Sequence, residues 1–271
     1  MVILKKIEEV RAQVKEWKKQ GLTVGLVPTM GYLHEGHQSL IKKSVEQNDR
    51  TVVSVFVNPI QFGPNEDLES YPRDLEADAK LCEATGADII FNPEPEEMYA
   101  DGFVSFINMT GLPNALCGLT RPVHFKGVCT VVGKLFNIVT PDRAYFGQKD
   151  AQQLAIIMRM VKDLNFDIEI VGCPIIREED GLAKSSRNIY LTPDERKAAV
   201  VLSKAVKLGQ GKIVGAMKDL ISAEPLATID YVEMVNMDTM QSIDKAEGHV
   251  LCAMAVRFGK ARLIDNFIEN L

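Results

Sequence analysis

Short apolar runs alternate with helical stretches through the first two thirds of the chain. The apolar runs cover residues 23–28, 51–57, 87–91, 143–147 and 167–174. The helical stretches fall near residues 36–48, 73–85, 126–139 and 149–163. This alternation is typical of βαβ units, in which helices cover both faces of a parallel sheet. The pattern therefore predicts an α/β fold with a Rossmann-like parallel sheet.

The first residues of the chain show helical spacing. Apolar side chains recur at Ile3, Ile7, Val10, Val14 and Trp17, and a glycine follows the Lys-rich turn after them. Glycine after a basic last turn is a common end for a helix. We therefore expect the chain to open with one amphipathic helix.

The pattern changes after a polar loop at residues 177–188. Thr192 and Pro193 have the form of a helix start, with proline at the first helical position. Two helices should follow, and then strands near residues 229–237, 249–258 and 261–269, which suit a small antiparallel sheet. This arrangement predicts two domains, a Rossmann-like domain at residues 1–175 and a small α+β C-terminal domain at residues 176–271.

Composition and charge exclude several classes of protein. The chain has 271 residues, of which 46% are hydrophobic and 25% charged, as is ordinary for a globular protein. A net charge of -6 argues against nonspecific binding to nucleic acid. No apolar run has the length of a membrane span, and charges interrupt the first residues, so neither a membrane helix nor a signal peptide is expected. Five scattered cysteines indicate reduced thiols and a cytoplasmic location.

The strongest chemical signal is the segment VPTMGYLHEGHQSL, which joins a predicted strand to a predicted helix. In this segment a turn at Gly31 precedes His34, Glu35, Gly36 and His37. Ligands bind at the carboxyl ends of strands in such sheets, and helix N-termini favour phosphate. Two imidazoles about one turn apart can donate hydrogen bonds to phosphoryl oxygens, and Gly36 would allow a nucleotide to approach closely. A metal site is disfavoured because the pair lacks a third ligand and the HExxH pattern.

A second signal is the polar loop EEDGLAKSSRN. It gathers Lys184, Ser185, Ser186 and Arg187, a set of donors suited to a triphosphate and a departing pyrophosphate. The same loop also has the composition of a hinge between domains, and the two interpretations are compatible.

A third signal lies at the end of the strand at 143–147. The strand runs through Gly147, Gln148, Lys149 and Asp150 into a helix that carries Gln152 and Gln153. Lys149 is suited to countering phosphate charge, whereas Asp150 has the position of a helix cap.

Two further segments carry polar groups near predicted strand ends. Asn58 and Gln61 offer amides to hydroxyl or carboxylate groups, and His124 is more typical of a structural histidine than of a ligand. The valines at 128, 131 and 132 have the spacing of core residues. Walker, GxGxxG and GxSxG motifs are absent from the sequence, which removes the usual support for kinase, dehydrogenase and hydrolase functions. A plain nucleotidylyltransferase and a nucleotide sensor without catalysis remain as alternatives.

The motifs taken together extend over nearly the whole chain. The motifs PTMGYLHEGH, VFVNPIQFGPNEDLESYPRD, RPVHFKGVCTVV, YFGQKDAQQL and GLAKSSRNIYL, in this order, closely resemble the pantothenate synthetase (pantoate–β-alanine ligase) family. The resemblance implies a C-terminal domain that acts as a lid, a homodimer, and a Mg-dependent reaction of ATP, pantoate and β-alanine. It also places the chain in the wider His-x-Gly-His nucleotidylyltransferase superfamily.

The resemblance also implies roles for individual residues. Gln61 and Gln153 would hold pantoate, His37 would be the proton donor, and His34 and Lys149 would act with it in catalysis. The implied ATP-binding residues are Met30, Gly31, Tyr32, Leu33, His34, Glu35, Gly36, His37, Gly147, Gln148, Lys149, Asp150, Ile176, Lys184, Ser185, Ser186 and Arg187. Lys184 departs from the apolar residue that the family commonly has there.

The implied reaction has two steps. The pantoate carboxylate attacks the α-phosphorus of ATP to give pantoyl adenylate and pyrophosphate, and the β-alanine amine then displaces AMP. We expect catalysis mainly by positioning and by stabilisation of charge on the phosphoryl oxygens.

Overall fold

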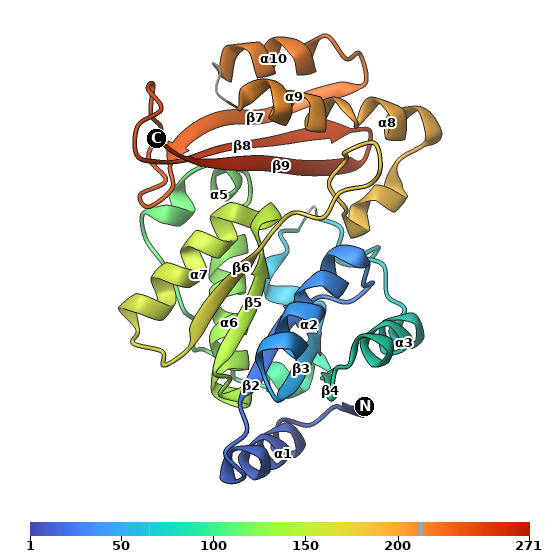
Figure 1. Ribbon diagram of the computed structural model, residues 1–271, viewed down its shortest axis with the longest axis vertical. Coiled ribbons are helices and arrows are strands. Elements are labelled where there is room, and N and C mark those ends of the chain that lie inside the picture. Colours follow the sequence, from blue (N-terminus) through green and yellow to red (C-terminus); the bar gives the residue numbers. More distant parts are fainter. Residues whose placement is uncertain (65, 211–213) are drawn as a thin grey trace. The chain divides into compact units, whose positions relative to one another are not determined.

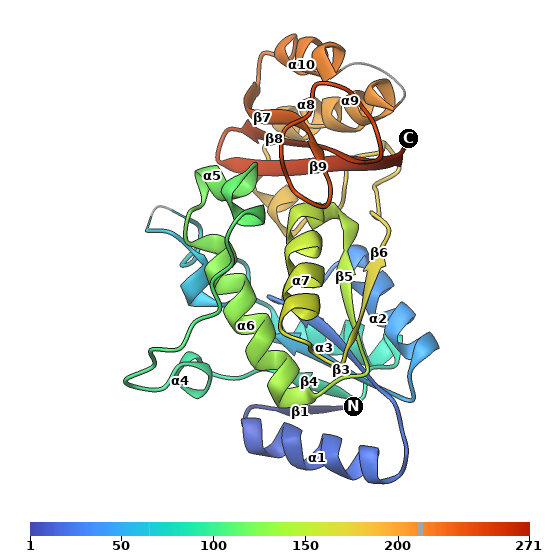
Figure 2. The same ribbon diagram turned by 90° about the vertical axis from the view of Figure 1, so that its left-hand side faces the viewer.

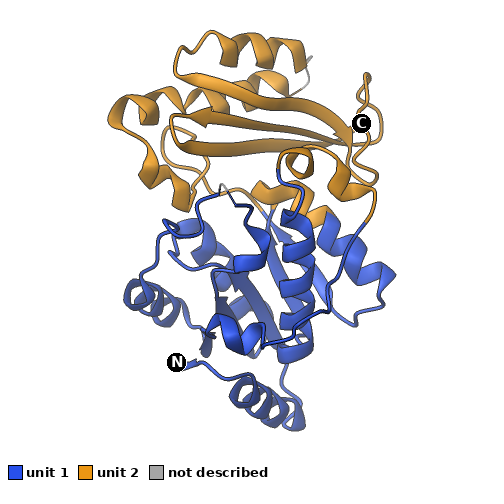
Figure 3. Ribbon diagram, turned by 180° about the vertical axis from the view of Figure 1, so that it is seen from behind, with its two compact units in different colours: residues 1–109, 121–147, 156–173 blue, residues 110–120, 148–155, 174–271 orange. Residues whose placement is uncertain are grey.

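The chain forms two compact units (Figures 1 and 3). The computed structural model describes residues 1–64, 66–210 and 214–271. Unit 1 comprises residues 1–109, 121–147 and 156–173, and unit 2 comprises residues 110–120, 148–155 and 174–271. Within the described part of the chain, no helix is both long enough and apolar enough to cross a bilayer.

A parallel sheet forms the centre of unit 1. Its strands lie in the order β1-β4-β3-β2-β5-β6, and every neighbouring pair is parallel. The strands are β1 (Val2–Leu4), β2 (Val24–Thr29), β3 (Arg50–Val55), β4 (Ile89–Phe91), β5 (Arg143–Gly147) and β6 (Glu169–Cys173). Strands β2, β3 and β4 are buried almost throughout, because helices cover both of their faces.

Helices follow the strands in the predicted alternation. Figure 2 shows α6 on one side of the sheet and α2 on the other. The longer helices are α1 (Ile7–Lys19), α2 (Glu35–Gln47), α3 (Leu75–Thr85), α6 (His124–Val139) and α7 (Ala151–Asp163). Shorter ones are α4 (Pro95–Met98), α5 (Cys117–Thr120) and the 3₁₀ turns η1 (Pro59–Gln61), η2 (Leu112–Asn114), η3 (Gln148–Asp150) and η4 (Ser186–Tyr190). The predicted α/β class, with a parallel sheet and helices on both faces, is confirmed.

The beginning of the chain differs from the prediction. Ile3 was expected in the first helix, but it lies in β1 and pairs with Ile90 of β4. The helix begins only at Ile7, whose backbone N–H donates to Glu97 at 2.9 Å. The prediction was wrong because residues 2–4 are a run of three apolar side chains that pairs with the edge of β4. The helix start is marked by the distant Glu97 and by the local Glu9, which accepts from the backbone N–H of Lys6 at 3.2 Å.

Unit 2 contains the predicted antiparallel sheet. Strands β7 (Ala227–Asn236), β8 (His249–Phe258) and β9 (Ala261–Asn270) pair in sequence order. The helices α8 (Pro193–Ala198), α9 (Val201–Gly209) and α10 (Val214–Ser222) precede them, so the described residues hold three helices where two were expected. Leu202, Met217 and Phe258 belong to one buried cluster, formed by helix and strand residues together.

The five cysteines are free thiols. Burial raises the pKa of Cys82, Cys129 and Cys252 to about 12, so these thiols stay protonated at neutral pH.

A buried ion pair attaches the loop after β6 to the sheet of unit 2. Arg177 donates two hydrogen bonds to Asp265 of β9, at 2.7 and 2.9 Å, and a third to the carbonyl of Gly181. Asp265 is only 1% exposed and also accepts from the backbone of Asn266. A bidentate Arg–carboxylate pair of this kind fixes geometry, and its loss leaves a charge without compensation.

Asp265→Ala should therefore destabilise the protein by about 3 kcal/mol, because Arg177 loses its carboxylate partner in a partly buried position. Denaturant unfolding measures the change. The matched control is Lys80→Ala, which breaks an exposed i,i+4 pair with Glu76 and should cost about 0.5 kcal/mol or less. Equal losses in the two variants would contradict the prediction.

Candidate active site

The strand order changes direction between β2 and β5. From β2 the chain proceeds outward through β3 and β4, and it then returns to place β5 on the other side of β2. Ligands bind at such switch points, beyond the carboxyl ends of the strands. The residues that follow β2, the residues that follow β3, and Gly147 at the end of β5 all lie at this edge of the sheet, and all three segments contain predicted site residues.

A tight turn after β2 brings the His-containing segment into position. Gly31 has φ 86° and Tyr32 has φ 51°, so the turn contains two successive left-handed residues. A side chain at residue 31 would be strained in this conformation, and its Cβ would lie 3.0 Å from Asp78 and from Val55. The glycine is thus required both by the backbone conformation and by the close approach of α3.

Asp78 of α3 holds this turn. Its two carboxylate oxygens accept hydrogen bonds from the backbone N–H groups of Tyr32, at 2.9 Å, and Leu33, at 2.6 Å. The side chain is 2% exposed, and burial raises the pKa of Asp78, although the two N–H donors act in the opposite direction. The backbone N–H groups of residues 32 and 33 are therefore occupied by an internal anion.

Backbone N–H groups hold the two imidazoles of the motif in place at the start of α2. The Nδ1 atom of His34 accepts from the backbone N–H of Gly36 at 3.1 Å, and the Nδ1 atom of His37 accepts from the backbone N–H of His34 at 3.3 Å. The ring centroids are 4.1 Å apart, and the rings are tilted by 43°. Because each Nδ1 is an acceptor, each neutral ring carries its proton on Nε2.

This arrangement suits the ring pair to a negatively charged ligand. Two Nε2–H donors lie at the N-terminus of a thirteen-residue helix, where partial positive charge collects. The proposed role of Gly36 changes, however. A Cβ on Gly36 would lie 2.7 Å from Cε1 of His34, so the space beside this glycine is occupied by the imidazole itself.

Gln61 lies in η1, beyond the end of β3, and is 6% exposed. Its amide oxygen accepts from Asn58 Nδ2 at 2.9 Å. Its amide nitrogen lies 3.1 Å from the thioether sulfur of Met30, which is a weak acceptor. A buried N–H₂ group with a sulfur partner would gain from an oxygen in its place, so a carboxylate or hydroxyl group of a ligand fits here.

Helix α6 fixes the backbone at Gln61. A Cβ on Gly127 would lie 2.5 Å from the Cα of Gln61 and from the carbonyl of Ile60, so only glycine permits this contact. His124, 7% exposed, has its Nδ1 3.2 Å from the Gln61 carbonyl oxygen, as a structural histidine would. The predicted core valines of α6, at positions 128, 131 and 132, are buried.

Unit 2 carries another group of the predicted residues. Gln148, Lys149 and Asp150 form η3, and Asn266 of β9 donates to the carbonyls of Gln148, at 3.0 Å, and Lys149, at 2.8 Å. These bonds hold the turn that carries the Lys149 ammonium.

The two neighbouring glutamines of α7 have different surroundings. Gln152 donates to the carbonyls of Leu112 and Ala115 and accepts from the N–H of Cys117, which makes it a structural residue of unit 2. Gln153 is half-buried in the first turn of α7.

The loop at residues 176–187 is internally bonded. The backbone N–H of Lys184 donates to the carbonyl of Ile176 at 2.9 Å, and its ammonium forms an ion pair with Glu178 at 3.0 Å. Ser185 caps η4 by accepting from the backbone N–H of Arg187. The Lys184 ammonium is paired with a carboxylate. The backbone of this loop and the residues after Lys184 are therefore better suited to binding phosphate than the Lys184 side chain.

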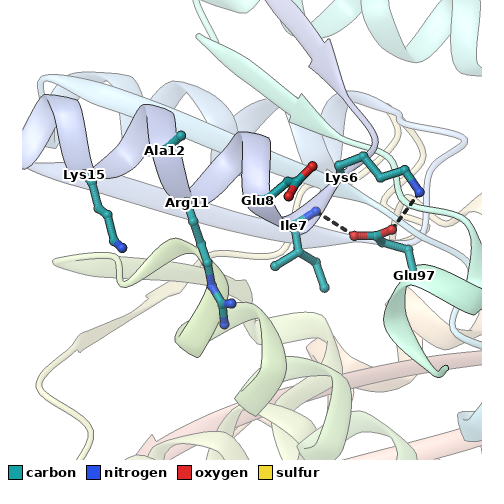
Figure 4. A pocket seen from close by; sticks show the side chains of 7 residues that line it. All are labelled: Lys6, Ile7, Glu8, Arg11, Ala12, Lys15 and Glu97. Carbon is teal, nitrogen blue, oxygen red and sulfur yellow. Dashed lines mark hydrogen bonds and ion pairs between the residues drawn. The ribbon is translucent and has the colours of Figure 1, made fainter.

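A cavity of about 650 Å³ lies between α1 and α4 and is lined by none of the predicted site residues (Figure 4). Its charged groups include Lys6, Arg11, Lys15 and Glu97. Glu97 accepts from the backbone N–H of Ile7 and from the Lys6 ammonium, so these two donors already have a carboxylate partner.

The described residues contain no group of three or more His, Cys, Asp or Glu side chains that could hold a metal ion. Mg²⁺ commonly binds to proteins through one or two carboxylates together with substrate phosphates and water. The site therefore fits a Mg²⁺ ion that arrives with ATP better than one held by a protein cage.

Two contributors to the site were missed in the sequence analysis. Asp78 has the same helical spacing as Leu75 and Cys82, and a carboxylate in such an apolar stripe is the signal that could have identified it. Asn266 lies in a strand 117 residues from Lys149, and no local pattern indicates that contact.

Comparison with known proteins gives matches along the whole chain. The pantoate-beta-alanine ligase family model matches residues 2–268. The pantothenate synthetase of Ruminiclostridium cellulolyticum is 63% identical over 96% of this chain and 96% of that protein, and the one of Clostridium acetobutylicum is 59% identical over all of both chains.

Solved structures of pantothenate synthetases also match the chain along nearly its whole length. The pantothenate synthetase of Thermus thermophilus matches with a TM-score of 0.93 at 45% identity, covering 98% of this chain and 99% of that chain. The pantoate-beta-alanine ligase of Francisella tularensis, complexed with beta-gamma ATP and beta-alanine, matches with a TM-score of 0.86 at 36% identity, covering 99% and 97%.

A Rossmann-like sheet with paired imidazoles after its first inner strand defines an α/β protein of the His-x-Gly-His class. The family model covers nearly the entire length. The chain belongs to the pantoate-beta-alanine ligase family.

Gly127→Ala should lower kcat/KM for pantoate by about 10-fold or more, because the added Cβ pushes η1 and Gln61 out of place. The KM for ATP should change by less than about 2-fold, since the imidazole pair is untouched. Gly63→Ala is the control, because its Cβ would meet only Glu66, at 3.6 Å. Unchanged pantoate kinetics in Gly127→Ala would refute the expectation that Gln61 holds pantoate.

Proposed function

We propose that this chain forms pantothenate from pantoate, β-alanine and ATP in two steps, with pantoyl adenylate as the intermediate. Its membership of the family makes it an ATP-dependent ligase of this kind. The observation that supports the two-step proposal most is the pair of backbone hydrogen bonds to His34 and His37, which fixes two Nε2–H donors in the same unit as the buried amide of Gln61.

In the first step a carboxylate oxygen of pantoate attacks the α-phosphorus of ATP. A new P–O bond forms, the bond to the bridging oxygen of the β-phosphate breaks, and pyrophosphate leaves. His34 and His37 donate hydrogen bonds to the phosphoryl oxygens on which charge collects, and His37 is the proton donor. Lys149 adds positive charge, and Ser185, Ser186 and Arg187 bind the leaving pyrophosphate. Mg²⁺ bound to the phosphates would neutralise part of their charge.

In the second step the amine of β-alanine attacks the acyl carbon of the adenylate. The C–O bond to the phosphate breaks, AMP leaves, and the nitrogen loses a proton as the amide forms. Gln61 and Gln153 keep pantoate aligned through both steps, by hydrogen bonds to its hydroxyl and carboxylate oxygens. The ligands named for the Francisella tularensis structure, beta-gamma ATP and beta-alanine, support one site that takes both.

The assembly is proposed to be a homodimer. Val104, Phe106 and Val123 of unit 1 are large apolar side chains that are 82%, 45% and 43% exposed. A second copy of the chain would cover such residues.

The free thiols support a cytoplasmic location. The family resemblance also supports a role of residues 176–271 as a lid.

With pantoate present and β-alanine absent, labelled pyrophosphate should exchange into ATP, because adenylation is complete before the amine is needed. Chromatography of the labelled nucleotide measures the exchange. Omitting pantoate is the control and should abolish it. Exchange that required β-alanine would exclude the two-step order, and AMP transfer to a phosphorylated acceptor would favour a plain nucleotidylyltransferase.

His37→Asn should slow pantoate-dependent exchange by roughly 100-fold, because asparagine removes the Nε2–H donor. Its Oδ1 can still accept from the backbone N–H of His34, so the thermal midpoint should stay close to that of the unchanged protein. His37→Gln places an N–H near the original Nε2 and should recover part of the rate. His249→Ala, at an exposed histidine paired with Asp238, is the control. A rate near normal in His37→Asn would show that the ring acts only as a cap.

A further inference from the structure

A chain of hydrogen bonds leads away from Gln61 to a tyrosine outside the predicted site. The hydroxyl of Tyr99, at the end of α4, donates to Asn58 Oδ1 at 2.6 Å. Asn58 is 1% exposed, and its Nδ2 donates to Gln61 Oε1 at 2.9 Å and to the carbonyl of Gly127 at 3.2 Å. The order of the chain is thus Tyr99, Asn58, Gln61.

The direction of each bond in this chain is fixed. The carbonyl of Gly127 can only accept, so it must face the N–H₂ end of the Asn58 amide. The Asn58 oxygen therefore faces Tyr99, whose hydroxyl must donate. In turn the N–H₂ group of Asn58 selects the oxygen of Gln61, and the N–H₂ group of Gln61 is left facing Met30.

Tyr99 is itself held in place. Its ring packs against Phe103, with centroids 5.1 Å apart, and against Phe56 at 6.2 Å. The ammonium of Lys134 lies 5.7 Å from the ring centre. Burial raises the pKa of Tyr99, which keeps its hydroxyl protonated as a donor.

We propose that Tyr99 is a positioning residue for pantoate, which acts through Asn58 to hold the Gln61 amide with its N–H₂ group toward the substrate. This inference rests on the proposed binding of pantoate by Gln61. A primary amide can flip at little steric cost, and a flipped Gln61 would present its oxygen to the substrate carboxylate and repel it. The tyrosine hydroxyl therefore favours a ligand that offers a hydrogen-bond acceptor to Gln61, although the hydroxyl itself does not contact the ligand.

Tyr99→Phe removes the hydroxyl and keeps the packed ring. Loss of the buried bond should raise the dissociation constant and the KM of pantoate by roughly 10-fold, with the KM of ATP changed by less than about 2-fold. Titration calorimetry and steady-state kinetics measure these values. Tyr145→Phe is the matched control, because it removes another buried hydroxyl of the same unit, one that accepts from Asn48 and donates to Gln47. It should leave pantoate binding unchanged while it lowers the thermal midpoint to a similar extent.

A double-mutant cycle tests the route of the effect. If Tyr99 acts through Gln61, then Tyr99→Phe should add almost nothing to the loss already caused by Gln61→Ala. Additive losses, or normal pantoate binding in Tyr99→Phe beside a loss in Gln61→Ala, would overturn the positioning role and leave the proposed role of Gln61 standing. Normal pantoate binding in Gln61→Ala would overturn both.

Asn58→Ala provides a second variant of the same chain, and it should show the same non-additivity with Gln61→Ala. Equal pantoate losses in Tyr99→Phe and Tyr145→Phe would assign the effect to stability alone and would also reject the proposal.

Discussion

Parallel pairing of β2 with β3 and β5 is the constraint on which the candidate site depends. Parallel strands place their carboxyl ends at one edge, so the turn at Gly31, the turn that carries Gln61 and the end of β5 at Gly147 meet there, although they are distant in sequence. Strand order adds the second half of the constraint. Because β5 returns to the opposite side of β2, this edge is a switch point, the place where sheets of this kind commonly bind ligands.

At this edge of the sheet, hydrogen bonds within unit 1 orient the polar groups of the candidate site. Asp78 occupies the N–H groups of the turn, the imidazoles accept through Nδ1, and the carbonyl of Gly127 orients Asn58. Each of these contacts fixes which end of a polar group accepts and which end donates. The chemical character of the site, two N–H donors of histidine and one of glutamine, is thus set by bonds within unit 1.

Much of the fold followed from the sequence because strand and helix periods are local properties. The five predicted apolar runs match strands β2 to β6, and Thr192-Pro193 begins α8 as predicted. The edge strand at Ile3 was missed because its pairing with β4 is not local. The motif residues of the candidate site were recognisable as a set, but Asp78 and Tyr99 were not, since their partners lie 45 and 41 residues away or more in sequence. Hydrogen bonds between distant segments leave no periodic signal.

The hydrogen bonds from backbone N–H groups to the two imidazoles also have an entropic consequence. A free histidine samples several rotamers, and ordering one upon binding costs about 0.5–1.5 kcal/mol per side chain. His34 and His37 are already ordered by backbone N–H groups, so that loss is incurred when the chain folds. In the proposed reaction, a larger share of the interaction with ATP would then be available to align its α-phosphorus for attack.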